Sequence, residues 1–380
     1  MLCVCGCGVN YAGGGCCEYS CSFAMASRPF SLVLGNGHAG AEKQALALAT
    51  SIGLPVAMAR RLPSPTLSRL PTRVLNAFTA RGWDTVIGLP KCTPPYAAVA
   101  ISCGRASIPA SIALRRSSSG RTLTVHIQRP PCDSMQFDLV VCPTHDYGSH
   151  TIPKPSNVLL TKGALHGVDR SALKQARVAW ASTFQQLPKP RVALLVGGDV
   201  SRRWWQRQLA PTVTPEVMRF LLHSIRTALG SSGSLLVTTS RRTPEKVSEA
   251  LRSELRRLFK TDSGGLKGRM WSPDDEPNPY LGMMAWADYI ITTPDSVSMI
   301  SEACGASTPL YVWDPLGCAG RFRSFHESML TSGATRAWGG VLDDPALWKL
   351  PAPAVSDTQV VAEYIIKLLA EREKSQPHVK

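Results

Sequence analysis

The sequence lacks several features that would assign it to common classes of protein. No apolar run reaches the ~20 residues that a membrane-spanning helix needs, so we expect a soluble or peripheral protein. No pair of Cys-x-x-Cys motifs recurs at zinc-finger spacing, and we expect no bound metal. Basic residues are scattered and not interleaved with aromatic ones, which argues against a nucleic-acid partner. The length of 380 residues is typical of about two domains. Hydrophobic residues make up 44% of the chain, which is typical of a globular protein.

The twelve cysteines are unevenly placed. Six lie in the first 21 residues, and the other six are spread over apolar and loop positions. This distribution predicts reduced thiols, not a secreted disulfide framework. Residues 1–30 are rich in Cys and Gly and lack the basic start of a secretory signal, so we expect a disordered tail. S-acylation of the clustered cysteines is the alternative.

The positive charge is concentrated in the first half of the chain. Residues 1–187 contain 18 Lys and Arg against 7 Asp and Glu, whereas residues 188–380 contain 24 against 20. A basic half favours an anionic partner such as a membrane surface or a phosphorylated substrate. Scattered surface charge without a specific partner is the alternative.

Short β-branched apolar runs recur through residues 31–187 and predict strands. The first run ends in a glycine loop, Gly35 to Gly40, before a predicted helix over residues 41–52. A strand, a glycine loop and a helix resemble a phosphate cradle, but the loop lacks the acidic partner of a dinucleotide site. The further strands are predicted at 54–60, 97–102, 122–127, 137–141 and 158–160, and polar loops follow them. In open α/β sheets ligands bind at these carboxyl ends.

Pro188-Lys189-Pro190 is a stiff break, and we place the domain boundary there. A second α/β cycle follows over residues 188–356. It begins with the strand Arg191 to Val196 and has predicted helices at 215–229, 245–259 and 280–286. A final amphipathic helix is predicted over residues 357–372.

The stretch Trp286 to Trp313 carries the strongest candidate site. It predicts a strand, a turn, a helix from Ser296 to Ala303 and a second strand. Ser296 and Ser298 lie in the first helical turn, where free N–H groups favour an anion. Glu302 lies one turn further along the face of Ser298, where a carboxylate can accept hydrogen bonds from a ribose diol. The alternative is that Asp295 or Ser296 caps the helix and Glu302 is solvated.

The second cycle offers a further anion-binding loop. Gly197 and Gly198 follow its first strand and allow close approach of a ligand to the backbone. Ser201 and Arg202 come next and can contact phosphate oxygens.

Four separated blocks together resemble one family. They are GNGHAGAEKQALALATSIGLP, HIQRPPCDSMQFDLVVCPTHDY, LLTKGALHGVDRSALKQARVAW and EPNPYLGMMAWADYIITTPDSVSMISEACGASTPLYV. In this order they resemble the plant mitochondrial fission factor of the elongated-mitochondria type and its uncharacterised bacterial relatives. The resemblance covers roughly residues 31–369. It implies a glycosyltransferase-B-like α/β architecture, two Rossmann-like domains facing across a cleft, in which the last helix crosses back to the N-terminal domain.

Two functions follow from the resemblance. The first is a peripheral adaptor, in the cytosol and on the cytosolic face of the mitochondrial outer membrane, that helps recruit a dynamin-related GTPase. The alternative is a glycosyltransferase that binds a nucleotide-diphosphate sugar. Its donor would lie between Gly197-Gly198, Ser240-Arg241, Asn278 and the helix from Ser296 to Glu302. The candidates for a general base are His38 and Asp146. No cofactor is required for the adaptor role.

Overall fold

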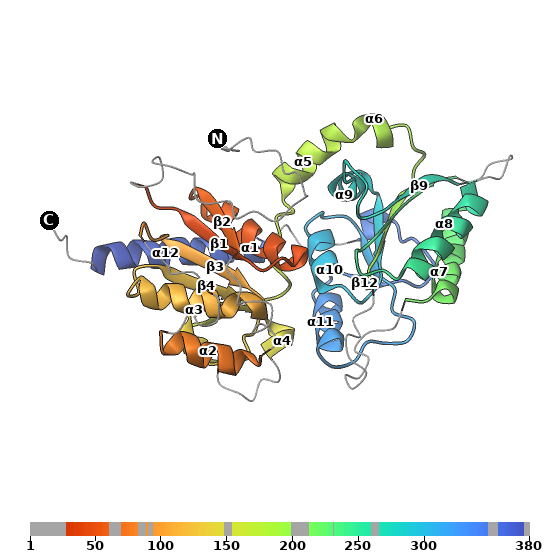
Figure 1. Ribbon diagram of the computed structural model, residues 1–380. Helices are drawn as coiled ribbons and strands as arrows, with labels where there is room; N and C mark the ends of the chain where they lie inside the picture. The colour runs from red at the N-terminus through yellow and green to blue at the C-terminus, as the bar shows by residue number, and fades with distance from the viewer. Residues whose placement is uncertain are drawn as a thin grey trace.

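The computed structural model describes residues 28–60, 70–82, 89, 94–147, 154–198, 213–230, 232–259, 266–348 and 356–375. These residues form two α/β domains, each with a six-stranded parallel sheet and helices packed on it (Figure 1). The strand orders are β2-β1-β3-β4-β5-β6 and β12-β11-β10-β7-β8-β9. The topology confirms the expected class of two Rossmann-like domains.

The first domain is built from the elements β1 (Ser31–Gly35), α1 (Ala39–Ile52), β2 (Val56–Arg60), α2 (Thr72–Ala80), β3 (Val99–Cys103), α3 (Ile108–Ser117), β4 (Leu123–Ile127), β5 (Leu139–Pro143), α4 (Thr144–Tyr147) and β6 (Val158–Thr161). The second contains β7 (Arg191–Val196), α7 (Pro215–Leu229), β8 (Ser234–Thr239), α8 (Glu245–Phe259), β9 (Lys267–Trp271), α9 (Tyr280–Trp286), β10 (Tyr289–Thr292), α10 (Val297–Cys304), β11 (Leu310–Val312), α11 (Gly320–Thr331) and β12 (Arg336–Ala337). Along the chain, α5 (Arg170–Ala179) and α6 (Ala181–Phe184) come between the strands of the first sheet and those of the second. Helix α12 (Asp357–Ser375) comes after the last strand of the second sheet.

The local sequence explains the best-defined elements. All six residues of β7 are buried, as expected for a parallel strand covered on both faces. Helix α7 begins where the Thr214 hydroxyl accepts a hydrogen bond from the Val217 amide, with Pro215 in the first turn. Its apolar residues recur every three or four positions and pack into the core with β7 and β8.

Helices α5 and α6 pack on the second domain, although residues 31–187 were expected to form the first. Trp180 lies against Gly282 of α9 so closely that a Cβ on Gly282 would overlap its ring. Arg177 donates to the carbonyl of Ala285 at 2.7 Å, and Phe184 is buried in the core of the second domain. Figure 1 shows both helices beside α9. The chain therefore passes from the first domain to the second near residues 162–169. This crossing comes before α5 and α6, and not at the Pro188–Pro190 break where the boundary was expected.

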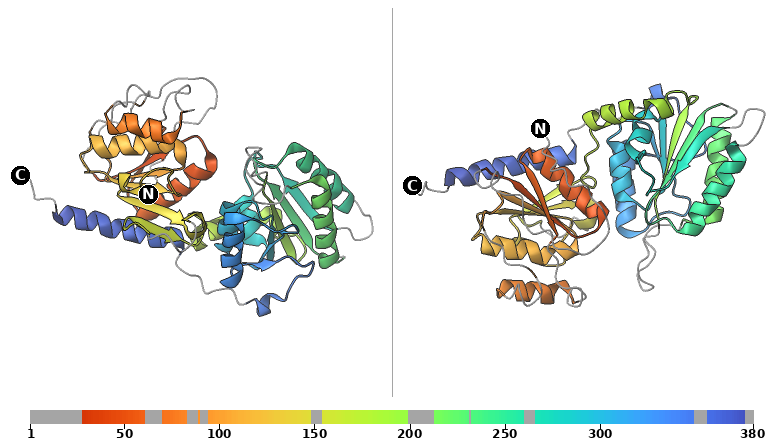
Figure 2. Two further views of the ribbon diagram at one scale, coloured as in Figure 1. Left: turned by 90° about the horizontal axis from the view of Figure 1, so that it is seen from below. Right: turned by 45° about the horizontal axis from the view of Figure 1, so that its top comes forward.

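Helix α12 lies along the first domain (Figure 2). Val361, Ala362 and Ile365 are buried in the core that contains Leu48 and Ala49 of α1. At its start, the Asp357 carboxylate accepts hydrogen bonds from the amides of residues 162 and 163, at 2.8 and 3.0 Å. The start of α12 is thus tied to the segment that connects the domains. No helix in the described ranges combines the length and apolarity needed to cross a bilayer.

Segments that follow strands of the two sheets meet where the domains touch. In the connecting segment, the Ala164 amide donates to the Ser301 hydroxyl of α10 at 3.0 Å. Arg321 of α11 forms an ion pair with Asp146 of α4 at 3.0 Å. These contacts position α10 beside the interdomain surface.

Candidate functional site

The second sheet has its topological switch point between β7 and β10. The chain runs outward from β7 to β8 and β9 on one side, and from β10 to β11 and β12 on the other. Ligands of open α/β sheets bind at the carboxyl ends of the strands at such a point. The loops that meet here are Gly197-Gly198 after β7 and Thr293 to Ser296 after β10.

The two glycines allow these loops to pack against each other. A Cβ on Gly197 would overlap the Asp295 carboxylate, and one on Gly198 would overlap the backbone of Arg242. The Gly197 amide donates to the Thr293 hydroxyl at 2.8 Å. The Gly198 amide donates to Oδ2 of Asp295 at 2.6 Å. Both N–H groups expected to face a ligand are therefore satisfied by the protein's own oxygen atoms.

Asp295 is the most deeply buried acidic group of this site. It is 2% exposed, and its Oδ1 has no hydrogen-bond partner among the described residues. Burial raises the pKa of this carboxyl, while the hydrogen bonds from Thr293 and Gly198 and the charge of Arg242 act in the opposite direction. A carboxylate thus occupies the place where loop amides would meet a phosphate.

The start of α10 still combines two groups suited to an anion. The buried Ser296 caps the helix by accepting a hydrogen bond from the Met299 amide at 3.4 Å. Arg242, in the loop after β8, donates from Nη2 to the Ser296 hydroxyl at 3.4 Å. A guanidinium beside a helix start is suited to phosphate oxygens. Ser240 lies in the same loop, where its hydroxyl is 3.1 Å from that of Thr243.

Glu302 faces the other domain and does not lie on the outer surface. Its carboxylate lies near the Tyr280 hydroxyl of α9 and within the influence of the charge of Lys43 in α1. Burial raises its pKa, and both partners lower it. Ser298, on the same face of α10, is half-buried. A carboxylate in this position can accept hydrogen bonds from ligand hydroxyl groups.

The other predicted donor-site residues are less closely grouped. Arg241 is exposed and lies 3.7 Å from Asp274. Asn278 is exposed, and its Oδ1 accepts a hydrogen bond from the Tyr280 amide, which orders the turn before α9. Ser201 and Arg202 lie outside the described residues.

The two candidates for a general base lie in the first domain. His38 is exposed and occupies the cap position of α1 without a side-chain hydrogen bond to the helix. Asp146 is paired with Arg321 across the domain contact, and His145 lies 3.8 Å from the same carboxylate oxygen. Because the Asp146 carboxylate is held by Arg321 of the other domain, its geometry indicates domain docking more than base catalysis.

Sequence reasoning missed Arg242, Tyr280 and Lys43 as members of the site. Arg242 could have been found, because it lies two residues after Ser240, a predicted site residue, in the same polar loop. Lys43 and Tyr280 reach Glu302 only through contacts between distant elements.

Comparisons with known proteins place the chain in a family. Residues 39–369 match the family model described as mitochondrial fission ELM1. The chain is 34% identical over 292 residues to the mitochondrial fission protein ELM1 of Arabidopsis thaliana, covering 72% of this chain and 64% of that protein. It is 24% identical over 323 residues to the uncharacterized protein RP120 of Rickettsia prowazekii, covering 74% and 82%. The chain thus spans less than two thirds of the plant relative.

Solved structures with two such domains are also similar. MurG of Acinetobacter baumannii is 12% identical with a TM-score of 0.45, and the match covers 90% of this chain and 100% of MurG. Os79 of O. sativa, solved in complex with UDP, is 12% identical with a TM-score of 0.45, covering 91% and 92%. At these scores the likeness says nothing about the ligand of this chain.

Proposed function

Because the chain belongs to the mitochondrial fission ELM1 family, we propose that it acts in mitochondrial division as a peripheral adaptor on the cytosolic face of the outer membrane. There it helps to recruit a dynamin-related GTPase. The family match over residues 39–369 is the observation that carries the proposal. The hydrogen bond from the Gly198 amide to Asp295 supports an adaptor over an enzyme, because the glycine loop binds an internal carboxylate.

Localisation and loss of function test this role. A tagged copy of the full chain is expected to collect on mitochondria in a protease-accessible position, and loss of the protein is expected to lengthen mitochondria. A copy that stays diffuse, together with unchanged mitochondrial length after loss, contradicts the proposal. The dynamin-related GTPase is expected to leave the mitochondrial surface in the same cells.

A second candidate is transfer from a nucleotide-diphosphate sugar, and the grouping of Arg242, Ser296 and Glu302 around α10 favours it. In this function Arg242 and the helix start hold the diphosphate, and Glu302 holds hydroxyl groups of the donor. Thermal unfolding with nucleoside diphosphates and their sugars tests it. A ligand at 100 times its dissociation constant adds ~2.7 kcal/mol to the free energy of unfolding. Absence of any shift removes this candidate and leaves the adaptor role intact.

A further inference from the structure

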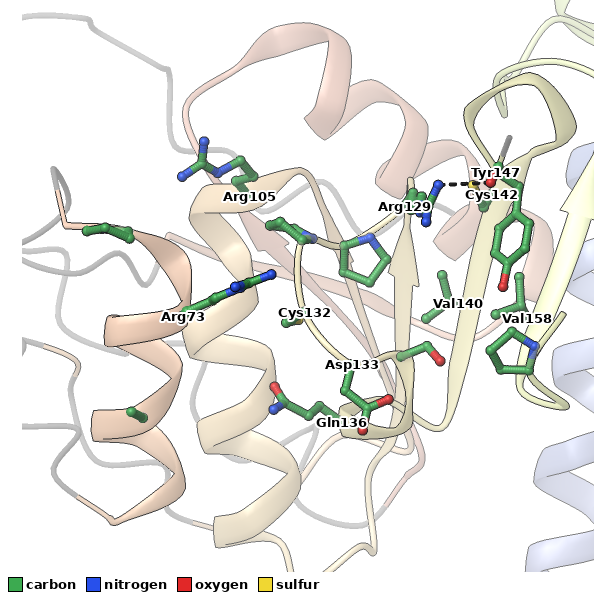
Figure 3. Close-up of a pocket in the computed structure, with 16 residues that line it drawn as sticks. Arg73, Arg105, Arg129, Cys132, Asp133, Gln136, Val140, Cys142, Tyr147 and Val158 are labelled. Carbon is green, nitrogen blue, oxygen red and sulfur yellow. Dashed lines mark hydrogen bonds between the residues drawn. The ribbon is translucent and has the colours of Figure 1, made fainter. Parts of the chain in front are cut away.

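A separate pocket lies in the first domain, away from α10 (Figure 3). Its volume is about 940 Å³. It is lined by the start of α2, the turn after β3, the segment after β4 and residues of β5 and β6. None of the predicted donor-site residues that the structure describes lines it. The volume falls within the range of about 300–1,000 Å³ that small-molecule sites occupy.

Three arginines from three elements surround this pocket: Arg73, Arg105 and Arg129. Arg129 is fixed in place, because its Nη1 donates to the carbonyl of Tyr147 at 2.8 Å and its guanidinium lies 5.2 Å from the centre of that ring. Among the described residues of the lining, Asp133 is the one acidic side chain. The lining therefore carries a positive excess, in the half of the chain where basic residues predominate.

The remaining polar groups are suited to hydroxyl groups. Oε1 of Gln136 is buried and has no hydrogen-bond partner among the described residues. It lies in the part of the lining that contains Asp133 (Figure 3). An amide oxygen and a carboxylate both accept hydrogen bonds from an alcohol. Pro130, Pro131 and Pro155 form rigid apolar parts of the wall.

We propose that this pocket binds a phosphorylated polyol. The guanidinium groups bind its phosphates through paired N–H donors, and Gln136 and Asp133 accept hydrogen bonds from its hydroxyl groups. Such a ligand has two natural sources, a soluble inositol phosphate and the headgroup of a phosphoinositide lipid. The proposal does not rest on the role in mitochondrial division, since binding is measured on the isolated protein.

Binding of inositol hexakisphosphate to the full chain, measured by calorimetry, tests the site in solution. Co-sedimentation with vesicles that contain a phosphatidylinositol bisphosphate tests the lipid source. Arg73→Gln and Arg129→Gln are each expected to weaken binding about tenfold, the loss of one charge-assisted contact. Arg28→Gln is the matched control. It removes the same charge from an exposed position before β1 that is not part of the pocket lining, and is expected to bind as the unchanged protein does.

The outcomes separate specific binding from general attraction. The site is supported if Arg73→Gln and Arg129→Gln bind the probe more weakly, Arg28→Gln does not, and the unfolding temperatures of all three are unchanged. If the protein then binds inositol hexakisphosphate but not the vesicles, the ligand is a soluble one. If it also binds the vesicles, the ligand is a lipid headgroup. Equal weakening in all three variants, or no binding of either probe, overturns the proposal. Gln136→Leu is a second test, because it leaves the charge unchanged and is expected to weaken polyol phosphates more than inorganic pyrophosphate.

Discussion

The carboxylate of Asp295 accepts a hydrogen bond from the amide of Gly198 at 2.6 Å, between loops that follow neighbouring strands. This contact places an anion of the protein itself at the switch point of the second sheet. The first sheet has a similar arrangement at its switch point between β1 and β3, where Asn36 donates from Nδ2 to the carbonyl of Cys103 at 2.7 Å. In both domains a side chain after one strand forms a hydrogen bond with the backbone of the neighbouring strand or loop at the switch point.

The buried carboxyl of Asp295 is expected to make stability depend on pH. Its pKa is raised by burial above the ordinary 3.8, so the folded state binds this proton more tightly than the unfolded state. The protonated Asp295 carboxyl therefore stabilises the folded state at low pH. This stabilisation is lost as the pH rises from 3.8 through the raised pKa of the folded state. Asp295→Asn keeps an acceptor for Gly198 and removes the titration. We expect its stability relative to the unchanged protein, measured by urea unfolding, to increase from acidic to neutral pH. Parallel pH profiles would contradict this.

Removal of the carboxylate is expected to create an anion site. Asp295→Ala leaves the buried Gly198 amide without an acceptor, at a cost of about 1–3 kcal/mol. Pyrophosphate can then bind between that amide, Arg242 and the start of α10, and is expected to raise the unfolding temperature of this variant more than that of the unchanged protein. Asp295→Asn is the control, because it still fills the space. Equal shifts in all three proteins would mean that Asp295 does not stand in for a phosphate.

The packing of α5 on α9 predicts a sharp difference between two glycines of the second domain. A Cβ on Gly282 would overlap the Trp180 ring, whereas no atom of the described residues lies within 4 Å of a Cβ on Gly339. We expect Gly282→Ala to lower the free energy of unfolding by about 1–3 kcal/mol, and Gly339→Ala to change it little. Denaturant unfolding measures both. A neutral Gly282→Ala would show that α5 is not held against α9.

The contact between α10 and the connecting segment predicts non-additive mutations. A Cβ on Gly163 would lie 2.5 Å from the Ser301 hydroxyl oxygen, and that oxygen accepts the hydrogen bond of the Ala164 amide. Gly163→Ala and Ser301→Ala are each expected to destabilise the protein, the second by about 1–3 kcal/mol. The double variant is expected to lose less than their sum, because the overlapping oxygen is absent. Gly167→Ala is the control, since its Cβ meets Ala47 at an ordinary 3.7 Å. Strict additivity would rule out the contact.

Much of the fold follows from local sequence. The predicted bounds of the strand 191–196 and of the helices 215–229 and 245–259 agree with β7, α7 and α8, because caps and apolar periodicity mark them clearly. Helix α11 was missed, since its polar residues obscure the stripe formed by Phe322, Phe325 and Met329. The domain to which α5 belongs could not be predicted, because the contact of Trp180 with Gly282 is tertiary.

The site was predictable in part. Ser296 caps α10, which confirms the capping alternative for that residue, and Glu302 lies toward the domain contact. The partnership of Gly198 with Asp295 joins residues 97 positions apart, and no local pattern reports it. Periodicity locates a loop at the carboxyl end of a strand, but it does not show which side chain fills the crevice.

We propose that the chain's role in mitochondrial division does not require sugar transfer at α10. The decisive measurement is mitochondrial length in cells that lack the protein and are complemented with Arg242→Ala or Glu302→Ala. At equal expression and localisation, we predict that both variants restore mitochondrial length as fully as the unchanged protein does. Elongated mitochondria in cells that express a stable, correctly localised variant would contradict the claim.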